Sequence, residues 1–402
     1  SDSVAQLSTV YEEVAGEPLA EMLDSELSFN FGEAVELLVD ELYTTDPFAL
    51  FEWVGKRWDL VDGTALSSDW EYKESHLQVL SWISILDACD IKQAMAGWGT
   101  DEDTLSNIMS ARTQEQVTLA KQSYGDLYDE DTSTTLEDDI KAETSGDYSS
   151  FMLYLMRDPA ECNAVAFRRA IKGFGTNDDL LLLLCCSLDA REIADAKRAY
   201  ARLYGRVLLN DVRSDTSGDY RATLTQILRC QRTTKTTLSC AEARRYADML
   251  WAAGEGLALG TDEATFIDVF TTLSPAQLRQ VEIQYNNLDG EEFPAGTDVD
   301  GDLGEALEAL SQIFGSEVEE SESRLVNAIK SEMSFNLKKA LLLLLRDADE
   351  VKARMLMKAF KGFGTDEELV SYAIGGSTKA QIEDVSDKYE ELFGKSLAEV
   401  AT

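Results

Sequence analysis

Four short loops with the same pattern of residue types recur along this 402-residue chain, at residues 97–102, 173–178, 258–263 and 362–367. Three have the form Gly-aromatic-Gly-Thr, and the other has Ala258 in place of its first glycine. Glycine at alternate positions lets backbone carbonyls turn to one side of a loop, through conformations that a side chain would block. Carbonyl oxygens suit a hard cation, and Ca²⁺ takes about six to eight oxygen ligands. The loops therefore predict calcium binding.

An acidic residue follows three of the loops and would complete the site. Glu143 lies 44 residues after Gly99, and Asp215 lies 40 residues after Gly175. In the third unit the interval from the last glycine to Glu332 is 72 residues, because a long acidic insertion intervenes. Carbonyls and a single carboxylate carry one formal charge, so we expect a dissociation constant on the order of 10⁻⁴ to 10⁻³ M. The remaining coordination positions are open to water or lipid phosphate.

A second motif accompanies the loops in register. Residues 136–148 match residues 208–220, and both end in Thr-Ser-Gly-Asp-Tyr. Weaker copies occur at 331–336 and 25–30. Two motifs that recur together predict a chain built from internal repeats.

The segments between the motifs have the composition and spacing of helices. Two segments are apolar runs, Leu180–Leu184 and Ala340–Leu345. Three others mix apolar and polar residues at helical spacing: Val117–Tyr124, Ile193–Tyr204 and Ala380–Phe393. Only five prolines interrupt the chain, and no Val/Ile/Thr alternation indicates a strand. We predict an all-α fold with several short helices in each unit.

A structural role for the same residues stays open beside the calcium role. Thr100, Thr176 and Thr365 each precede an acid by three positions, which is the spacing of a helix N-cap. Thr144 and Thr216 have the same spacing in the second motif. Capping accounts for the threonines and the acids. It does not account for the glycines before the threonine, or for the acid just before Thr-Ser-Gly-Asp.

The formal net charge of -39 limits the class of partner. It disfavours nucleic acid, whose phosphates would be repelled. It also opposes direct docking on anionic lipid, so a membrane partner requires a bridging cation. The alternative is that the acidic surface only keeps the protein soluble. The one histidine, His76, stands in no motif, so histidine-rich zinc sites are excluded and no enzyme is expected.

The cysteines favour a reducing compartment. None of them forms a CxxC pair, and their spacing is irregular: Cys89, Cys162, Cys185, Cys186, Cys230 and Cys240. Residues 1–42 lack the pattern of a signal peptide, so free thiols in the cytoplasm are expected. No apolar run approaches the length of a transmembrane helix.

The repeated Gly-x-Gly-Thr-Asp-Glu loop, the acid about 40 residues later and Thr-Ser-Gly-Asp-Tyr resemble the annexin family. The resemblance covers about residues 87–402 and a half-unit at 1–42. It implies four repeats of five helices in a curved disc, with calcium loops on the convex face. It also implies Ca²⁺-dependent, peripheral binding to acidic phospholipid membranes from the cytosol. A divergent, alpha-giardin-like member fits too, as does a cytoskeletal or coat protein with cytoskeletal partners on the same scaffold.

Carried over by position, the resemblance implies loop carbonyls and one carboxylate for each repeat. The ligand sets are Met95, Gly97, Gly99 and Glu143; Ile171, Gly173, Gly175 and Asp215; Gly256, Ala258, Gly260 and Glu332; and Phe360, Gly362, Gly364 and Glu26. The register of the third set is ambiguous, because Gly254 also precedes the loop. We expect the loop tips to contact the membrane, unless they fold back onto their own helices: Trp98, Phe174, Leu259 and Phe363.

The motifs divide the chain into six segments. They are a half-repeat at 1–42, an aromatic-rich connector at 43–86, and repeats at 87–156, 157–230, 239–346 (with an acidic insertion at 287–323) and 347–402. Within the insertion, Asp298–Asp302 resembles an EF-hand loop with a misplaced glycine, and a solvated loop is favoured.

The fourth repeat lacks an acid of its own. In the second repeat the acid Asp215 follows Gly205. The same interval counted from Gly394 would place the acid of the fourth repeat beyond Thr402. Near the start of the chain, the same interval counted from Gly16 leads to Glu26. We hypothesise that the half-repeat completes the fourth repeat, within the chain or on a neighbouring molecule by self-association. A fragment of a longer, two-lobed protein is the alternative.

Overall fold

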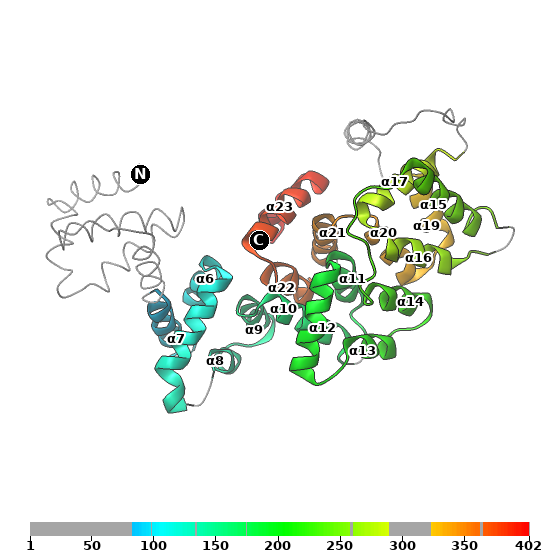
Figure 1. Ribbon diagram of the computed structural model, residues 1–402. Helices are drawn as coiled ribbons and strands as arrows, with labels where there is room; N and C mark the ends of the chain where they lie inside the picture. Colours follow the sequence, from blue (N-terminus) through cyan, green and yellow to red (C-terminus); the bar gives the residue numbers. More distant parts are fainter. Residues whose placement is uncertain are drawn as a thin grey trace, which may run out of the picture. The chain divides into compact units, whose positions relative to one another are not determined.

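The computed structural model describes residues 83–97, 99–132, 135–173, 175–257, 260–288, 323–361 and 365–401. Every regular element in these ranges is an α-helix, so the predicted fold class is confirmed (Figure 1). The chain divides into two compact units, Ser1–Ser145 and Gly146–Thr402. Among the helices of the described ranges, none combines the length and the apolar character needed to span a membrane.

The described part of the first unit contains a helix over residues 83–94 and three further helices. These are α6 (Glu102–Ala111), α7 (Gln114–Thr132) and α8 (Leu136–Glu143). Leu105, Tyr124 and Ile140 are fully buried between them. Arg112 at the end of α6 donates two hydrogen bonds of 2.7 Å to the buried carboxylate of Asp87. An apolar core and a buried ion pair therefore fix the two helices that flank the first loop.

The second unit begins with one helix, followed by helices that repeat in the same order. Its described helices are α9 (Gly146–Leu155), followed by three series. The first series is α10 (Pro159–Ile171), α11 (Asp178–Ser187), α12 (Ala190–Tyr204), α13 (Leu208–Asp215) and α14 (Gly218–Ile227). The second is α15 (Cys240–Ala253), α16 (Glu263–Thr272), α17 (Pro275–Asn286), α19 (Arg324–Glu332) and α20 (Phe335–Leu344), and the third is α21 (Ala348–Phe360), α22 (Glu367–Gly375), α23 (Lys379–Phe393) and α24 (Leu397–Ala401).

The first and third helices of each series pack together, as α10 with α12, α15 with α17, and α21 with α23. Gly205 and Gly394 end α12 and α23 with φ of +62° and +66°. Glycine adopts this left-handed conformation without the steric cost of a side chain. The two glycines thus have the same role in different series, in the register that the sequence repeat indicates.

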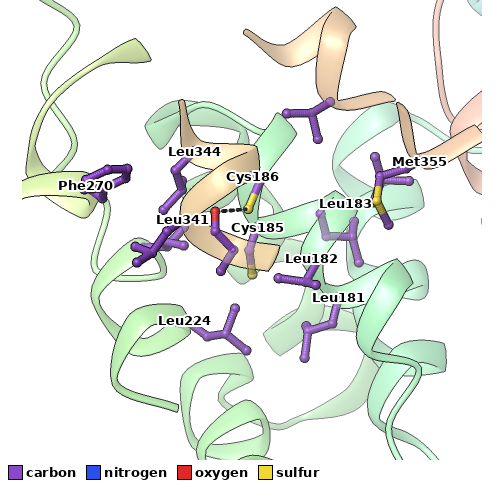
Figure 2. Close-up of a cluster of buried hydrophobic side chains, with 14 of the residues drawn as sticks. Leu181, Leu182, Leu183, Cys185, Cys186, Leu224, Phe270, Leu341, Leu344 and Met355 are labelled. Carbon is purple, nitrogen blue, oxygen red and sulfur yellow. Dashed lines mark hydrogen bonds between the residues drawn. The ribbon is translucent and has the colours of Figure 1, made fainter. Parts of the chain in front are cut away.

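Helix α11 lies at the centre of the second unit. Leu180–Leu184 are all fully buried, because α11 packs against α10, α14, α20, α21 and α22. A helix that is apolar on all sides needs such neighbours. Figure 2 shows its leucines with Leu224, Phe270 and Met355 from three other helices. The apolar run seen in the sequence is therefore the core of the unit.

The threonine-capping interpretation is wrong. The N-caps after the loops are the next residues along the chain, whose side chains accept a backbone N–H three residues on: Asp101, Asn177, Asp262 and Asp366. In the second motif, Thr144 and Thr216 end helices, and their hydroxyls donate to Ile140 O at 2.5 Å and Val212 O at 2.7 Å. Because Asp and Asn cap the helices, the loop threonines are available for another role.

All six cysteines are free thiols, as expected. Burial raises the pKa of Cys162 and of Cys186 to about 12. It raises the pKa of Cys185 well above its usual value as well. These three side chains therefore act as small apolar core residues.

Predictions about residues 1–82 and 289–322 lie outside the described residues. They include the half-repeat, the connector and almost all of the acidic insertion. The assignment of α9 to the first repeat and the bounds of the repeats stay predictions. In the second unit, α9 packs against α22, where Tyr154 Oη donates to Glu368 Oε1 at 2.7 Å and Arg169 pairs with the same carboxylate.

Candidate calcium sites

Each predicted loop is closed by one backbone hydrogen bond from its N-cap residue. The N–H groups of Asp101, Asn177, Asp262 and Asp366 donate to the carbonyls of Ala94, Ala170, Ala253 and Ala359 at 2.8, 2.8, 2.7 and 3.2 Å. The bonded residues are seven apart in the first, second and fourth loops and nine apart in the third. The third loop therefore contains two additional residues.

The loop glycines adopt conformations that other residues avoid. Gly97 and Gly99 have φ of +101° and +88°, and Gly173 and Gly175 have φ of +130° and +91°. Gly260 has φ of +81°. A Cβ built on any of the five would meet no atom within 4 Å, so open space lies beside this backbone. Exposed glycine turns with open space beside the backbone are compatible with a loop that holds a cation through its carbonyls.

The threonine of each of the first three loops hydrogen-bonds to its predicted acidic residue. Thr100 Oγ1 donates to the backbone carbonyl of Glu143 at 2.8 Å. Thr176 Oγ1 donates to Asp215 Oδ2 at 2.6 Å, with the Asp215 carbonyl at 3.3 Å. These bonds bring together segments about 40 residues apart in the sequence.

In the third loop Thr261 Oγ1 donates to Glu332 Oε2 at 2.7 Å, across 71 residues. In all three pairs the acidic residue is exposed, so its carboxylate is accessible to a cation. Met95 and Ile171, by contrast, bury their side chains at the start of the first two loops, with 7% and 8% exposed. Apolar anchors thus hold the backbone of each loop, and the polar side of the loop faces solvent.

The helices that carry the acids are anchored one turn earlier. In α13, Asp211 accepts from Tyr200 Oη at 2.8 Å and from Nε and Nη2 of Arg206 at 2.6 Å each. Arg206 lowers the pKa of Asp211 below its usual value, and the bond from Tyr200 adds to the effect. In α8, Asp139 has the same role, with Tyr124 Oη and Lys92 Nζ as donors. These pairs fix the helix ends from which Glu143 and Asp215 project.

The third loop is built differently. Ala328 stands one turn before Glu332, so no carboxylate is available there. Tyr285 Oη donates instead to Glu255 Oε1 at 3.1 Å, and Arg324 pairs with Glu255 at 2.7 Å. Glu255 belongs to the lengthened part of the loop. The additional residues therefore supply the acid that the helix lacks.

The lengthened part also fixes the position of Gly256. Its N–H donates to Trp251 O at 2.8 Å, and Leu257 N–H donates to Gly254 O at 2.9 Å. A Cβ on Gly256 would lie 3.0 Å from the Trp251 ring and from Ala252 Cα. The backbone of Gly256 thus lies too close to its neighbours for a side chain. This lack of space, and not a left-handed backbone conformation, explains why the residue is glycine. Its assignment as a ligand stays a prediction.

Several predicted site residues lie outside the described residues. They are the loop tips Trp98, Phe174, Leu259 and Phe363, together with Ala258, Gly362, Gly364 and Glu26. Phe360 ends α21 and is half-buried. Among the described residues, no group of three or more His, Cys, Asp or Glu side chains is arranged to hold a metal. The predicted sites contain one carboxylate each and depend on backbone oxygens for the other ligands.

Comparison with known proteins identifies the family. The sequence model of the family described as Annexin matches residues 86–155, 163–227 and 351–400 of this chain. Annexin A13 of Mus musculus is 32% identical over 317 residues, which cover 78% of this chain and 88% of that protein. The chain belongs to the annexin family. The solved structure of annexin III is 27% identical with a TM-score of 0.66, and the match covers 79% of this chain and 88% of that one.

A calcium-bound structure of alpha-14 giardin is also similar, with a TM-score of 0.56, 17% identity, and coverage of 80% of this chain and 93% of that one. At this identity the likeness shows the fold alone. The annexin fold and family predicted from the motifs are confirmed. Annexins bind Ca²⁺, their general function is calcium-dependent phospholipid binding, and they are generally non-enzymatic.

Sequence reasoning missed two features of this annexin. The threonines contact the acidic residues, and the signal was their presence after the last glycine in all four loops. The second feature is Phe335, which begins α20 with φ of +43° and has 88% of its surface exposed. Its signal was the phenylalanine that stands where the two strong copies of the motif have the glycine of Thr-Ser-Gly-Asp.

Proposed function

We propose that this annexin binds acidic phospholipid membranes through Ca²⁺ held by loop carbonyls and one carboxylate in each of its first three repeats. The proposed carboxylates are Glu143, Asp215 and Glu332. The proposed carbonyl ligands are those of Met95, Gly97 and Gly99, of Ile171, Gly173 and Gly175, and of Gly256, Ala258 and Gly260. When bound, Ca²⁺ would supply the positive charge that joins these oxygens to a lipid phosphate.

The observation that carries the proposal is the hydrogen bond from a loop threonine to the acidic residue or its backbone in three separate repeats. Helix capping does not require this hydrogen bond, because the following helices are already capped by Asp101, Asn177 and Asp262. In the second and third repeats the bond uses one carboxylate oxygen and leaves the other available. The threonine thereby orients the carboxylate toward its own loop. An orienting partner of this kind raises the affinity of a metal site.

Charge supports the same mechanism. With a formal net charge of -39, the protein is repelled by an anionic bilayer unless a cation intervenes. A site with one carboxylate binds Ca²⁺ weakly in solution, and lipid phosphate would supply the missing anionic ligands. The protein would then bind as a peripheral protein on the cytosolic face of a membrane. The four loop tips would lie closest to the lipid.

The experiment is co-sedimentation with vesicles of phosphatidylcholine alone and of phosphatidylcholine with phosphatidylserine, in Ca²⁺ and in chelator. We expect pelleting only with Ca²⁺ and phosphatidylserine together, and release when chelator is added. Equal pelleting in Ca²⁺ and chelator would overturn the calcium bridge. It would favour the cytoskeletal or coat role on an annexin scaffold, which needs no Ca²⁺.

A further inference from the structure

We propose that the turn between α19 and α20 is a second lipid contact that holds no Ca²⁺ of its own, in which Phe335 inserts into the interface of an anionic bilayer beside the third calcium loop. The inference rests on the proposed function and adds to it a membrane anchor outside the four loops. It names one partner, the interfacial region of a phospholipid bilayer with acidic headgroups.

Phe335 occupies a position that glycine holds in the two strong copies of the motif and that Phe29 holds in the copy at 25–30. The corresponding helices α9 and α14 begin with Gly146 and Gly218, whose φ values are +62° and +58°. Phe335 begins α20 with φ of +43°. Apart from Cys230, it is the one non-glycine residue of the described ranges with positive φ. For a bulky residue this conformation is a strained outlier. Folding alone favours glycine here, so the phenylalanine needs another explanation.

The ring does not contribute to the core. Phe335 is 88% exposed, whereas the next most exposed large apolar side chain of the described ranges, Val207, is 57% exposed. Phenylalanine is among the residues most often buried in folded proteins. An aromatic ring held in solvent by a strained backbone indicates a surface that binds an apolar or interfacial partner.

The turn lies at the calcium-binding end of the third repeat. Glu332, three residues before Phe335, accepts the hydrogen bond from Thr261 of the third loop. The same loop segment exposes Leu257 (43%) and Trp251 at the end of α15 (41%). Exposed apolar side chains thus come from both segments that this hydrogen bond joins. A membrane bound by the third loop would meet Phe335 as well.

Charge around the turn favours an anionic surface. Residues 324–346 contain five Lys or Arg and one acid, whereas the corresponding residues 207–229 contain three of each. The corresponding residues 135–157 contain two Lys or Arg and five acids. Lys330 and Lys338 flank the turn, and neither forms an ion pair with a described residue. An aromatic residue between lysines matches the chemistry of an acidic bilayer surface. Arg324, Lys339 and Arg346 pair with acids outside this segment, so among the described residues its unpaired positive charge lies on Lys330 and Lys338.

The test compares the full chain with Phe335→Gly in co-sedimentation at saturating Ca²⁺ with phosphatidylserine-containing vesicles. Glycine is the residue of the corresponding turns, so the variant keeps its fold and its calcium loops, which a thermal melt verifies. The matched control is Val207→Ser, which removes an exposed apolar side chain at the end of α13 opposite Asp215. We expect Phe335→Gly to need about fivefold to tenfold more lipid for half-maximal binding. The control should match the wild type.

A second variant, Phe335→Trp, tests insertion directly. We expect it to bind as the wild type does, and to show more fluorescence quenching by brominated acyl chains than the wild type shows from its own tryptophans. Equal lipid requirements for Phe335→Gly and the wild type, or no additional quenching in Phe335→Trp, would overturn the inference. Loss of self-association in Phe335→Gly without loss of lipid binding would also overturn it.

A double variant tests whether the two lysines beside the turn contribute to lipid binding. Lys330→Gln with Lys338→Gln should weaken binding to phosphatidylserine vesicles by about fivefold or more, because each lysine near an anionic surface contributes to attraction. Lys395→Gln, just before α24, removes a surface lysine at the other end of a helix series and should leave binding unchanged. If the wild type itself fails to bind with Ca²⁺, the proposed function and this inference fall together. If the wild type binds and all turn variants match it, only this inference falls.

Discussion

Replacing Thr176 with valine removes one hydroxyl and keeps the shape of the side chain, the loop glycines and Asp215. In the structure this hydroxyl donates to Asp215 Oδ2 at 2.6 Å. A hydrogen bond to a charged group contributes about 1.5–3 kcal/mol, and this one is exposed, so the lower end applies. About 1.4 kcal/mol corresponds to a tenfold change in affinity. Loss of a partner that orients a metal ligand has an effect of similar size.

The assay measures the Ca²⁺ concentration for half-maximal vesicle binding, in a background with Glu143→Gln and Glu332→Gln so that the second repeat dominates. We expect Thr176→Val to raise this concentration about tenfold. The matched control is Ser214→Ala, which removes a hydroxyl next to Asp215 that donates to Asp211 O at 2.8 Å and does not contact the loop. A Thr176→Val midpoint equal to that of the control would refute the orienting role of the threonine.

Three further predictions concern stability and thiol reactivity. Asp211→Asn should lower the free energy of unfolding by about 2 kcal/mol in urea titrations, since Asp211 accepts from Tyr200 and Arg206. Because the folded pKa of Asp211 is lowered, this contribution is complete above about pH 4 and is lost as pH falls through the folded pKa, so the wild type and the variant should converge in acid. Gly175→Ala, at φ of +91°, should cost about 1–2 kcal/mol, whereas Gly125→Ala within α7 should be neutral or stabilising in the same assay. A thiol reagent should modify the exposed Cys89 and Cys240 quickly and the buried cysteines only on unfolding, and rapid modification of all six would contradict the core.

The sequence predicted the helices well because their signals are local. Leu180–Leu184 is a continuous apolar run, and Ile193–Tyr204 has apolar residues at helical spacing. Both lie in helices that bury these apolar residues. The pairing of Thr176 with Asp215 is not local, but the recurrence of both motifs made the pairing of loop and acid predictable. Repetition therefore supplied the long-range information that a single unit lacks.

Three structural features could not be predicted from the sequence, even with the help of the repeats. Threonine and the residue after it both have capping side chains, so the sequence cannot tell which of Thr100 and Asp101 caps α6. The third loop contains several small residues, and only the bond from Asp262 N–H to Ala253 O locates its additional length. Positive φ at Phe335 follows from its place in the repeat and not from its own propensity, which opposes that conformation.

The most direct test of the central claim combines the three acids in one variant, Glu143→Gln with Asp215→Asn and Glu332→Gln. These side chains are exposed at helix ends, so the variant should fold as the wild type does. With phosphatidylserine vesicles and Ca²⁺ we predict that the wild type pellets and the triple variant stays in the supernatant. Pelleting of the folded triple variant at the same Ca²⁺ concentration as the wild type would contradict the account.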